Sequence, residues 1–560
     1  MTRPSETGAV RKPWGSAIPV ALVYPNSYQV GMGNLGFQVL YKAINSHPRF
    51  LAERFFLPDS SSRSGASVQV PMSEESSRPL SDFAVIAFSV PFEMDYAAVP
   101  GILISAGIEP LQKDRSAQLP LILAGGVSVS MNPEPLAPFL DLAFIGELEE
   151  DIEGGLLFSA LADILDASDR RSDSKDDLLE KLRNIPGVYV PSAYSFDFDE
   201  AGQIREIQVK PGFPHRVRAV KRLSPDSGVP VSVLFSPEAE FGDSLLVETN
   251  RGCGRGCRFC ASGWIHRPVR HVALSRFHDD ISLAVAHGKT VGLIGSDLAG
   301  HPQLEEVLAR ILELGGNFSL SSIRPEGLTP EVIRLMARSG QKTATLAPET
   351  ASSRMKQIIG KEIPSARFHD LVGKLVSAGI PNIRFYFMVG LPTETDEDVE
   401  AISEFVLESR RVFVNASRPL GRIGKISVQL SPFVPKPWTP FQWAAMPPAS
   451  LLEKRLRTIK EALRKEPNIV VRTESVQDAV AQAVLSRGDR RISGAILRQA
   501  CARGRWLGAF KEEGLDVGRY AHREQSVAEI LPWDVTDHGI SKETLAQVFL
   551  KAIGHKVEAL

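Results

Sequence analysis

The sequence has few cysteines, no long apolar runs and no dominant charge. Only four of the 560 residues are cysteine, which excludes a disulfide-built scaffold. No apolar run approaches the ~18 residues of a membrane-spanning helix, and the polar stretch 1–16 lacks the apolar core of a secretory signal. We therefore expect a cytoplasmic protein without a membrane partner.

The two charge signs are nearly balanced. The 64 Lys and Arg residues oppose 66 Asp and Glu residues, for a net charge of −2. Proteins that coat nucleic acids neutralise phosphate with a large positive excess, so the charge argues against that class without excluding a local basic patch. One basic cluster lies at 215–222, where a solvated strand edge is the simpler interpretation.

The length and the apolar content suffice for several globular domains. Hydrophobic residues make up 43% of the chain and charged residues 23%, and a domain has ~150 residues on average. We predict an α/β domain with its linker over 1–185, a bridging β-rich segment over 186–243, a barrel over 244–445 and a mainly helical C-terminal region over 446–560. Within the first domain, 60–77 is expected to be a loop and 163–181 a solvated helix or linker.

The first domain alternates apolar strands with helical patterns. Strands are predicted at 20–24, 83–90, 119–124 and 140–145, with helices from 35, capped by Asn34, and over 96–106. Continuous apolar strands separated by helices are typical of a parallel sheet covered on both faces, here a doubly wound Rossmann-like domain. Glycines near the strand ends mark either ligand contacts or ordinary turns; these are Gly31, Gly125, Gly126 and Gly146.

The second α/β region has six predicted strands with helices between them. The strands are 245–249, 290–295, 318–323, 343–347, 383–389 and 426–430, an order that fits a (β/α)6 partial TIM-type barrel, although an open doubly wound sheet would share the pattern. In such barrels the chemistry lies at the carboxyl ends of the strands. Polar residues follow several of these ends, among them Ser296, Arg324 and Glu349.

Three of the four cysteines lie within eight residues. Cys253, Cys257 and Cys260 have the spacing C-x3-C-x2-C, and three thiolates would leave one iron of a 4Fe–4S cluster open to a ligand. A zinc site with His266 or His271 as fourth ligand is an alternative, as is a redox loop or a chance clustering. Cys501, on a predicted helix, is expected to be a buried inert thiol.

The loop 253–260 resembles the signature of the radical S-adenosylmethionine (SAM) superfamily, including the aromatic Phe259 before the third cysteine. Further motifs of that family follow in order at 292–297, 321–326, 347–350 and 387–394. The N-terminal motifs 25–32, 124–126 and 144–147, with 431–441 and 487–491 later in the chain, are similar to radical SAM proteins that carry a cobalamin-binding-like domain. The segment 292–297 departs from the usual Gly-Gly-Glu type.

The resemblance implies roles for individual residues. Cys253, Cys257 and Cys260 would ligate the cluster, and Phe259, Gly295, Ser296 and Ser322 would contribute to the SAM site. Arg324 would pair with the SAM carboxylate or simply with Glu326. Glu349 would accept hydrogen bonds from ribose or form a surface ion pair. Gly390 and Pro392 would shape the turn near adenine, and the four N-terminal glycines would border cobalamin.

The resemblance also implies the activity. The expected enzyme cleaves SAM reductively to a 5′-deoxyadenosyl radical, with cobalamin-dependent methyl transfer to an unactivated carbon as one continuation. A cobalamin-independent rearrangement, cyclisation or sulfur insertion is a second reading, and a metal-stabilised binding module a third. A flavodoxin or ferredoxin would supply electrons to act on an unidentified small-molecule or macromolecular substrate. The chain lacks a D-x-H-x-x-G motif, so no such histidine would ligate the cobalt of cobalamin.

Overall fold

The computed structural model divides into two compact units. It describes residues 6–15, 17–57, 70–116, 120–148, 157–167, 175–221, 230–502 and 504–554; residues 60–69 of the predicted loop and 168–174 of the predicted linker lie outside this part. Unit 1 comprises Met1–Asp243, Val484–Asp516 and Ala528–Gly539, and unit 2 comprises Ser244–Ala483, Val517–Val527 and Ile540–Leu560. The C-terminal region therefore contributes segments to both units. Among the described helices, none has both the length and the hydropathy to cross a membrane.

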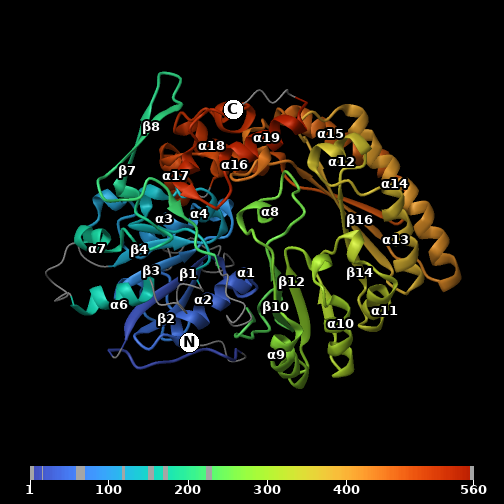
Figure 1. Ribbon diagram of the computed structural model, residues 1–560, viewed down its shortest axis with the longest axis horizontal. Helices are drawn as coiled ribbons and strands as arrows, with labels where there is room; N and C mark the ends of the chain where they lie inside the picture. Colours follow the sequence, from blue (N-terminus) through green and yellow to red (C-terminus); the bar gives the residue numbers. More distant parts are fainter. Residues whose placement is uncertain are drawn as a thin grey trace. The chain divides into compact units, whose positions relative to one another are not determined.

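Unit 1 is built on a six-stranded sheet in the order β2-β1-β3-β4-β5-β6 (Figure 1). The parallel strands are β1 (Ile18–Ser27), β2 (Phe50–Leu57), β3 (Val85–Ser89), β4 (Leu121–Gly125) and β5 (Leu142–Phe144), and β6 (Val188–Tyr189) runs antiparallel to β5. Four of these strands overlap the predicted ones. The predicted doubly wound α/β fold is thereby confirmed.

Strand β2 was not expected, because charged residues interrupt its apolar pattern. Glu53 and Arg54 lie in its middle, yet both are buried. Arg54 forms ion pairs of 2.5 Å with Glu6 and 2.6 Å with Glu75. A buried charge is tolerated only when it is paired and hydrogen-bonded, and the partners here come from distant parts of the chain.

The helices of unit 1 include the two that were predicted from residue 35 and over 96–106. They are α1 (Tyr28–Met32), α2 (Leu35–Ser46), α3 (Ala98–Ser105), α4 (Val127–Met131), α6 (Leu157–Ala167) and α7 (Lys175–Leu182). The Asn34 side chain caps α2 by accepting the Phe37 N–H, as predicted. A hairpin of β7 (Tyr194–Phe198) and β8 (Ile204–Val209) follows, and β9 (Val217–Arg218) pairs with β18 (Thr536–Asp537). From the tail, α17 (Ser493–Ala502) and α18 (Trp506–Glu512) complete the unit.

Unit 2 has the strand and helix alternation of the predicted partial barrel. The strands are β10 (Ser244–Arg251), β12 (Thr290–Gly295), β13 (Phe318–Leu320), β14 (Thr343–Glu349), β15 (Asn382–Val389) and β16 (Ile426–Pro432), all in the predicted order. The helices between and beside them are α8 (Ser262–Ile265), α9 (Leu274–Ala286), α10 (Leu304–Glu313), α11 (Pro330–Arg338), α12 (Ser353–Ile359), α13 (Ser365–Ser377), α14 (Asp396–Ser417) and α15 (Ala449–Leu463).

The strands of unit 2 form two four-stranded sheets, β11-β10-β12-β13 and β14-β15-β16-β17. Strand β11 (Arg270–His271) is a short antiparallel addition to β10, and β17 (Ile469–Thr473) extends the second sheet in parallel with β16. Neither strand was predicted. Helices α16 (Val476–Arg487) and α19 (Lys542–Ala552) follow in the largely helical C-terminal region. The barrel strands thus lie in two arcs, divided between β13 and β14.

Candidate active site

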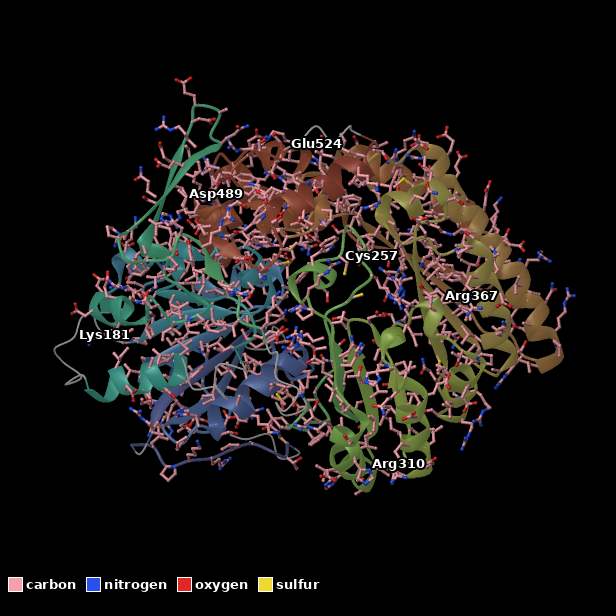
Figure 2. The ribbon with its side chains drawn as sticks, viewed as in Figure 1. Lys181, Cys257, Arg310, Arg367, Asp489 and Glu524 are labelled. Atoms are coloured by element: carbon pink, nitrogen blue, oxygen red, sulfur yellow. The ribbon has the colours of Figure 1, made fainter. Side chains whose placement is uncertain are left out.

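The three-cysteine loop connects β10 to the short helix α8 at the carboxyl end of the first barrel strand (Figure 2, Cys257). Cys257 is buried, whereas Cys253 and Cys260 are partly exposed. Gly252 (φ +80°) and Gly256 (φ +74°) adopt left-handed backbone conformations. A Cβ on Gly252 would lie 2.3 Å from the His266 carbonyl oxygen, so the loop requires glycine there.

Hydrogen bonds hold the loop in place on both sides. The Arg258 N–H donates to the Ile359 carbonyl at 2.9 Å, and its guanidinium donates to the Ile358 carbonyl at 2.6 Å, both at the end of α12. The Trp264 indole donates to the Cys257 carbonyl at 2.9 Å. These hydrogen bonds position the backbone that carries the thiols against the end of α12 and against α8.

The thiols lie close enough to affect one another electrostatically. Burial raises the pKa of Cys253 and Cys260, and Cys257 raises both further by like-charge repulsion. In the part of the chain that the structure describes, no three His, Cys, Asp or Glu side chains converge on a point that would hold a single metal ion. Zinc needs such convergence, whereas each cysteine of a 4Fe–4S cluster binds a different iron.

Arg324 lies against the cysteine loop from the end of β13. Its Nη1 donates to the Cys257 sulfur at 3.6 Å, and its Nη2 donates to Glu326 at 3.2 Å. Its Nε is buried without an acceptor in the structure. Arg324 thus forms the expected pair with Glu326 and also presents an unused donor beside the thiols.

Asp297 follows β12 at the predicted rim, within a recognised motif, but the sequence assigned it no role. One oxygen forms a 3.2 Å ion pair with Arg255 of the cysteine loop, and the other is buried without a partner. Its neighbour Ser296 is exposed and accepts a 2.9 Å hydrogen bond from Ser262. Gly295 packs on Asn250, whose side-chain oxygen would lie 2.1 Å from a Cβ, so this glycine has a packing role.

Glu349, the last residue of β14, has a left-handed backbone with φ +66°. For a residue with a side chain this conformation is strained, and such strain concentrates at functional sites. Lys361 forms a 2.9 Å ion pair with Glu349, and the Glu349 carboxylate contributes to the raised pKa of Cys260. Lys361 has no sequence signal, because the turn after α12 brings it there. The next residue, Thr350, has a buried hydroxyl without a partner.

The remaining predicted residues divide between exposed and packed positions. Ser322 is exposed, Phe259 and Pro392 are partly exposed, and Gly390 is buried. Gly390 has φ +91°, and a Cβ there would lie 2.4 Å from the Leu452 side chain. Its N–H donates to the Glu394 carboxylate at 2.6 Å. A hydrogen bond between two residues of the turn itself therefore stabilises the turn after β15.

Burial of Glu394 makes the turn after β15 sensitive to pH. Its carboxylate also pairs with Arg455 at 3.1 Å, and burial raises its pKa from 4.5 to about 7. A raised carboxyl pKa stabilises the fold below pH 4.5, and this contribution is lost as the pH rises toward 7. We expect Glu394→Gln to reduce the fall in unfolding free energy between pH 5 and pH 8, measured by urea titration. The exposed Glu306→Gln is the matched control, and an unchanged pH slope in Glu394→Gln would contradict the assignment.

The N-terminal glycines are packed against the chain itself. A Cβ on Gly31, inside α1, would lie 2.5 Å from the Phe56 ring. At Gly126 (φ +108°) it would lie 2.5 Å from the Val90 carbonyl oxygen, and at Gly146 (φ +115°) 2.2 Å from that of Val220. Gly125 has ordinary clearance, with 3.7 Å to the Phe144 carbonyl oxygen. Three of the four glycines therefore permit close packing within unit 1.

Substitution of Gly146 should be costly for this reason. Gly146→Ala adds both left-handed strain and a clash with Val220, and we expect it to lower the unfolding free energy by about 3 kcal/mol. Gly107→Ala, at φ +71° with no atom within 4 Å of the added Cβ, should cost only about 1 kcal/mol. Chemical denaturation measures both. Equal losses would show that the contact with Val220 is unimportant.

The structure also describes two other features of the sequence, Cys501 and residues 215–221 of the basic cluster. Cys501 is exposed, so the expectation of a buried thiol is wrong; it lies on the surface of α17, where the following Ala502 is exposed as well. In the basic cluster, His215, Arg216 and Arg218 are exposed. Val217 and Arg218 form the edge pair with β18.

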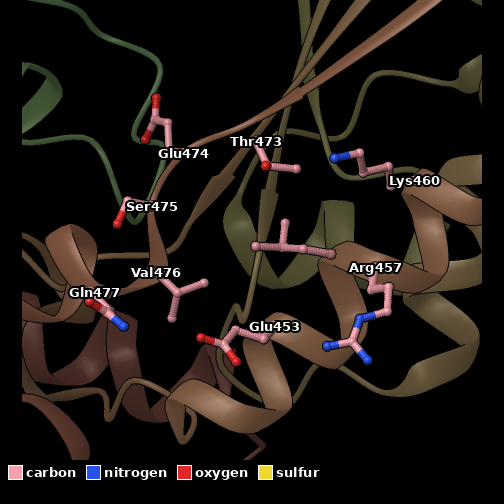
Figure 3. A pocket seen from close by; sticks show the side chains of 9 residues that line it. Glu453, Arg457, Lys460, Thr473, Glu474, Ser475, Val476 and Gln477 are labelled. Carbon is pink, nitrogen blue, oxygen red and sulfur yellow. The ribbon is translucent and has the colours of Figure 1, made fainter.

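A pocket of about 350 Å³ lies between α15 and the start of α16, beyond the end of β17 (Figure 3). Its lining includes Arg457 and Lys460 from α15, and Glu474 and Ser475 before α16. None of the predicted site residues lines it. The pocket is therefore separate from the cysteine loop.

Comparison with known proteins identifies the family. The family model for the N-terminal region of radical SAM proteins matches residues 36–191, and the model for the radical SAM superfamily matches 247–406. The uncharacterized protein MJ0966 of Methanocaldococcus jannaschii is 27% identical over 480 residues, covering 85% of this chain and 89% of that protein. The threonylcarbamoyladenosine tRNA methylthiotransferase MtaB of Aquifex aeolicus is 22% identical over 48% of this chain and 68% of its own length.

A solved structure has the same overall fold. It is the radical SAM methyltransferase TsrM of Kitasatospora setae with cobalamin and a 4Fe–4S cluster bound. The match has a TM-score of 0.50 at 13% identity and covers 87% of this chain and all of TsrM. At this identity the likeness establishes the fold, including the partial barrel.

Fold, cysteine loop and matched models together define a radical SAM enzyme. The chain belongs to the radical SAM superfamily. Members of this family use a 4Fe–4S cluster and SAM. The residues of unit 2 fit both groups. Three thiols lie on one loop, and three buried polar atoms that follow β12, β13 and β14 have no hydrogen-bond partner among the described residues, namely Asp297 Oδ1, Arg324 Nε and Thr350 Oγ1.

Proposed function

We propose that this enzyme cleaves SAM reductively and uses the resulting 5′-deoxyadenosyl radical to abstract a hydrogen atom from its substrate. The observation that carries the proposal is the rim of unit 2, where the cysteine loop is hydrogen-bonded in place beside polar groups that lack partners. Orphaned buried polar atoms are costly in a folded protein unless a ligand satisfies them.

Each rim residue has a distinct task in this proposal. Cys253, Cys257 and Cys260 hold the cluster, and Arg324 offers its free Nε to the SAM carboxylate. The free oxygen of Asp297 accepts from the SAM amino group, with Ser296 and Ser322 as exposed hydroxyls nearby along the rim. When bound, the cluster supplies the electron that breaks the carbon–sulfur bond of SAM.

Glu349 is proposed to bind the ribose hydroxyls. The left-handed backbone sets its carboxylate at the strand end, and Lys361 holds it from the other side at 2.9 Å. The turn 390–392 after β15 is proposed to border the adenine, with Gly390 fixed by Glu394. Phe259 and Gly295 maintain the shape of the loop and of the β12 end.

We propose that the reaction then continues on the substrate itself, as a rearrangement or cyclisation. Several relatives are methylthiotransferases, but outside the loop this chain has one cysteine, Cys501. Its own thiols therefore offer no second cluster as a sulfur donor. Corrinoid-dependent methyl transfer, the class to which TsrM belongs, depends on unit 1 and is addressed below.

Electrons are proposed to come from a flavodoxin or ferredoxin in the cytoplasm. The test is electron paramagnetic resonance of the anaerobically reconstituted, reduced protein. A 4Fe–4S signal that changes on addition of SAM supports a cluster with an open iron. A signal insensitive to saturating SAM would overturn the proposal, because the free iron would then not be the SAM site.

A further inference from the structure

We infer that the ligand-binding edge of the unit 1 sheet is closed by the chain's own backbone and tail, so that this domain retains no corrinoid. The inference deepens the proposed function, on which it rests, by assigning the radical reaction to a corrinoid-free enzyme. Open α/β sheets bind ligands beyond the carboxyl ends of their strands, next to the point where the strand order reverses. In unit 1 these ends are those of β1, β3, β4 and β5.

The ends of β3 and β4 are tied to each other. The Val90 N–H donates to the Gly125 carbonyl at 2.8 Å, and the Ser128 hydroxyl donates to the Val90 carbonyl at 2.7 Å. Gly126 approaches the same carbonyl so closely that even a Cβ would not fit. The glycine turn thus packs against the backbone of Val90 and leaves no space there for a large ring.

The end of β5 is covered by residues 219–221. The Val220 N–H donates to the Ile145 carbonyl, and the Glu147 N–H donates to the Val220 carbonyl, both at 3.0 Å. The Gly146 N–H donates to the Ser130 hydroxyl, also at 3.0 Å. Every one of these backbone groups, which could otherwise bind a ligand, is engaged within unit 1.

A tail latch, formed by Ser486, Gly488, Arg490 and His538, covers the loop after β4. The buried Asn132 side chain donates to the Ser486 and Gly488 carbonyls at 3.0 and 2.8 Å. The Ser486 hydroxyl donates to Glu93, which follows β3, at 2.7 Å.

Two further contacts extend the latch. His538 Nε2 lies 2.8 Å from the Ser130 carbonyl oxygen. Arg490 pairs at 2.7 Å with Glu134, whose side chain is fully buried and also accepts from Tyr189. Removing one partner of a buried pair leaves an uncompensated charge, so displacing the latch for a ligand is unfavourable.

The end of β1 is closed as well. The Asn26 amide donates to Asp95, beyond β3, at 2.8 Å and so bridges the point where the strand order reverses. Gly31, in the helix after β1, packs on Phe56. In the described part of unit 1 these contacts close the carboxyl ends of β1, β3, β4 and β5, and the sequence lacks the D-x-H-x-x-G motif whose histidine would ligate cobalt.

Corrinoid retention tests the inference on the full-length, cluster-reconstituted protein. The protein is mixed anaerobically with excess hydroxocobalamin and desalted, and corrinoid and iron are quantified per chain. We expect full iron with corrinoid no higher than in a serum albumin control. One corrinoid per chain would overturn the inference while leaving the proposed SAM cleavage intact, whereas failure of the SAM test would leave the corrinoid result standing.

Hydrogen exchange tests the latch itself. In the wild type, amides at 486–492 should exchange as slowly as those of β4. Asn132→Ala should accelerate them at least about tenfold, since two buried carbonyls lose their donor. Asn382→Ala, which removes a donor to the Lys342 carbonyl in unit 2, is the matched control. Fast exchange at 486–492 in the wild type would by itself overturn the latch, whether or not the variant folds.

Discussion

Replacing Cys257 with alanine should abolish iron binding and, with it, all SAM cleavage. Cys257 is a buried residue of the loop, and its sulfur accepts a hydrogen bond from the Arg324 guanidinium. Two thiolates do not hold a 4Fe–4S cluster stably, so iron after anaerobic reconstitution should fall from about four atoms per chain to a trace. Iron and acid-labile sulfide analysis measures the loss directly.

Cys501→Ala is the matched control for this prediction. Cys501 is exposed on α17, in unit 1, so its removal should leave iron content and activity unchanged. Circular dichroism of Cys257→Ala should match the wild type, because hydrogen bonds from backbone and arginine side chains hold the loop. Stoichiometric iron in Cys257→Ala would contradict the assignment of this thiol.

Replacing Glu349 with glutamine should weaken SAM binding about tenfold to a hundredfold while the cluster remains. A hydrogen bond to a charged group contributes about 1.5–3 kcal/mol, and glutamine retains the size and one acceptor for Lys361. Equilibrium binding of SAM to the oxidised, iron-loaded protein measures the change without requiring turnover.

The control for Glu349→Gln is Glu331→Gln, at an exposed pair with Arg334. It should leave SAM affinity unchanged. If Glu349→Gln binds SAM as tightly as the wild type, the Glu349 carboxylate does not bind SAM. If the variant loses iron, the carboxylate has a structural role instead.

The sequence predicted the repeating parts of the fold well. Apolar runs located β1, β3, β4 and β5, and the six barrel strands, because strands buried on both faces need continuous apolar residues. It failed at β2, where buried charges are compensated by Glu6 and Glu75 from elsewhere in the chain. It also missed β17, a short strand in a region with mostly helical periodicity.

The residues of the candidate site were likewise predicted only in part. The cysteine spacing is local and could be read directly, and the strand ends located Arg324 and Glu349. Lys361 and the free oxygen of Asp297 depend on how loops meet in space, which no periodicity encodes. The glycines at 126 and 146 fitted either ligand contacts or turns, and only the structure places Val90 and Val220 against them.

The most direct measurement of the central claim is product analysis of the reduced enzyme. Anaerobically reconstituted protein is mixed with dithionite and SAM, and nucleosides are separated by liquid chromatography and mass spectrometry. The account predicts 5′-deoxyadenosine and methionine in equal amounts from the wild type, and none from Cys257→Ala. Iron-loaded, reduced wild type that forms no 5′-deoxyadenosine would contradict it.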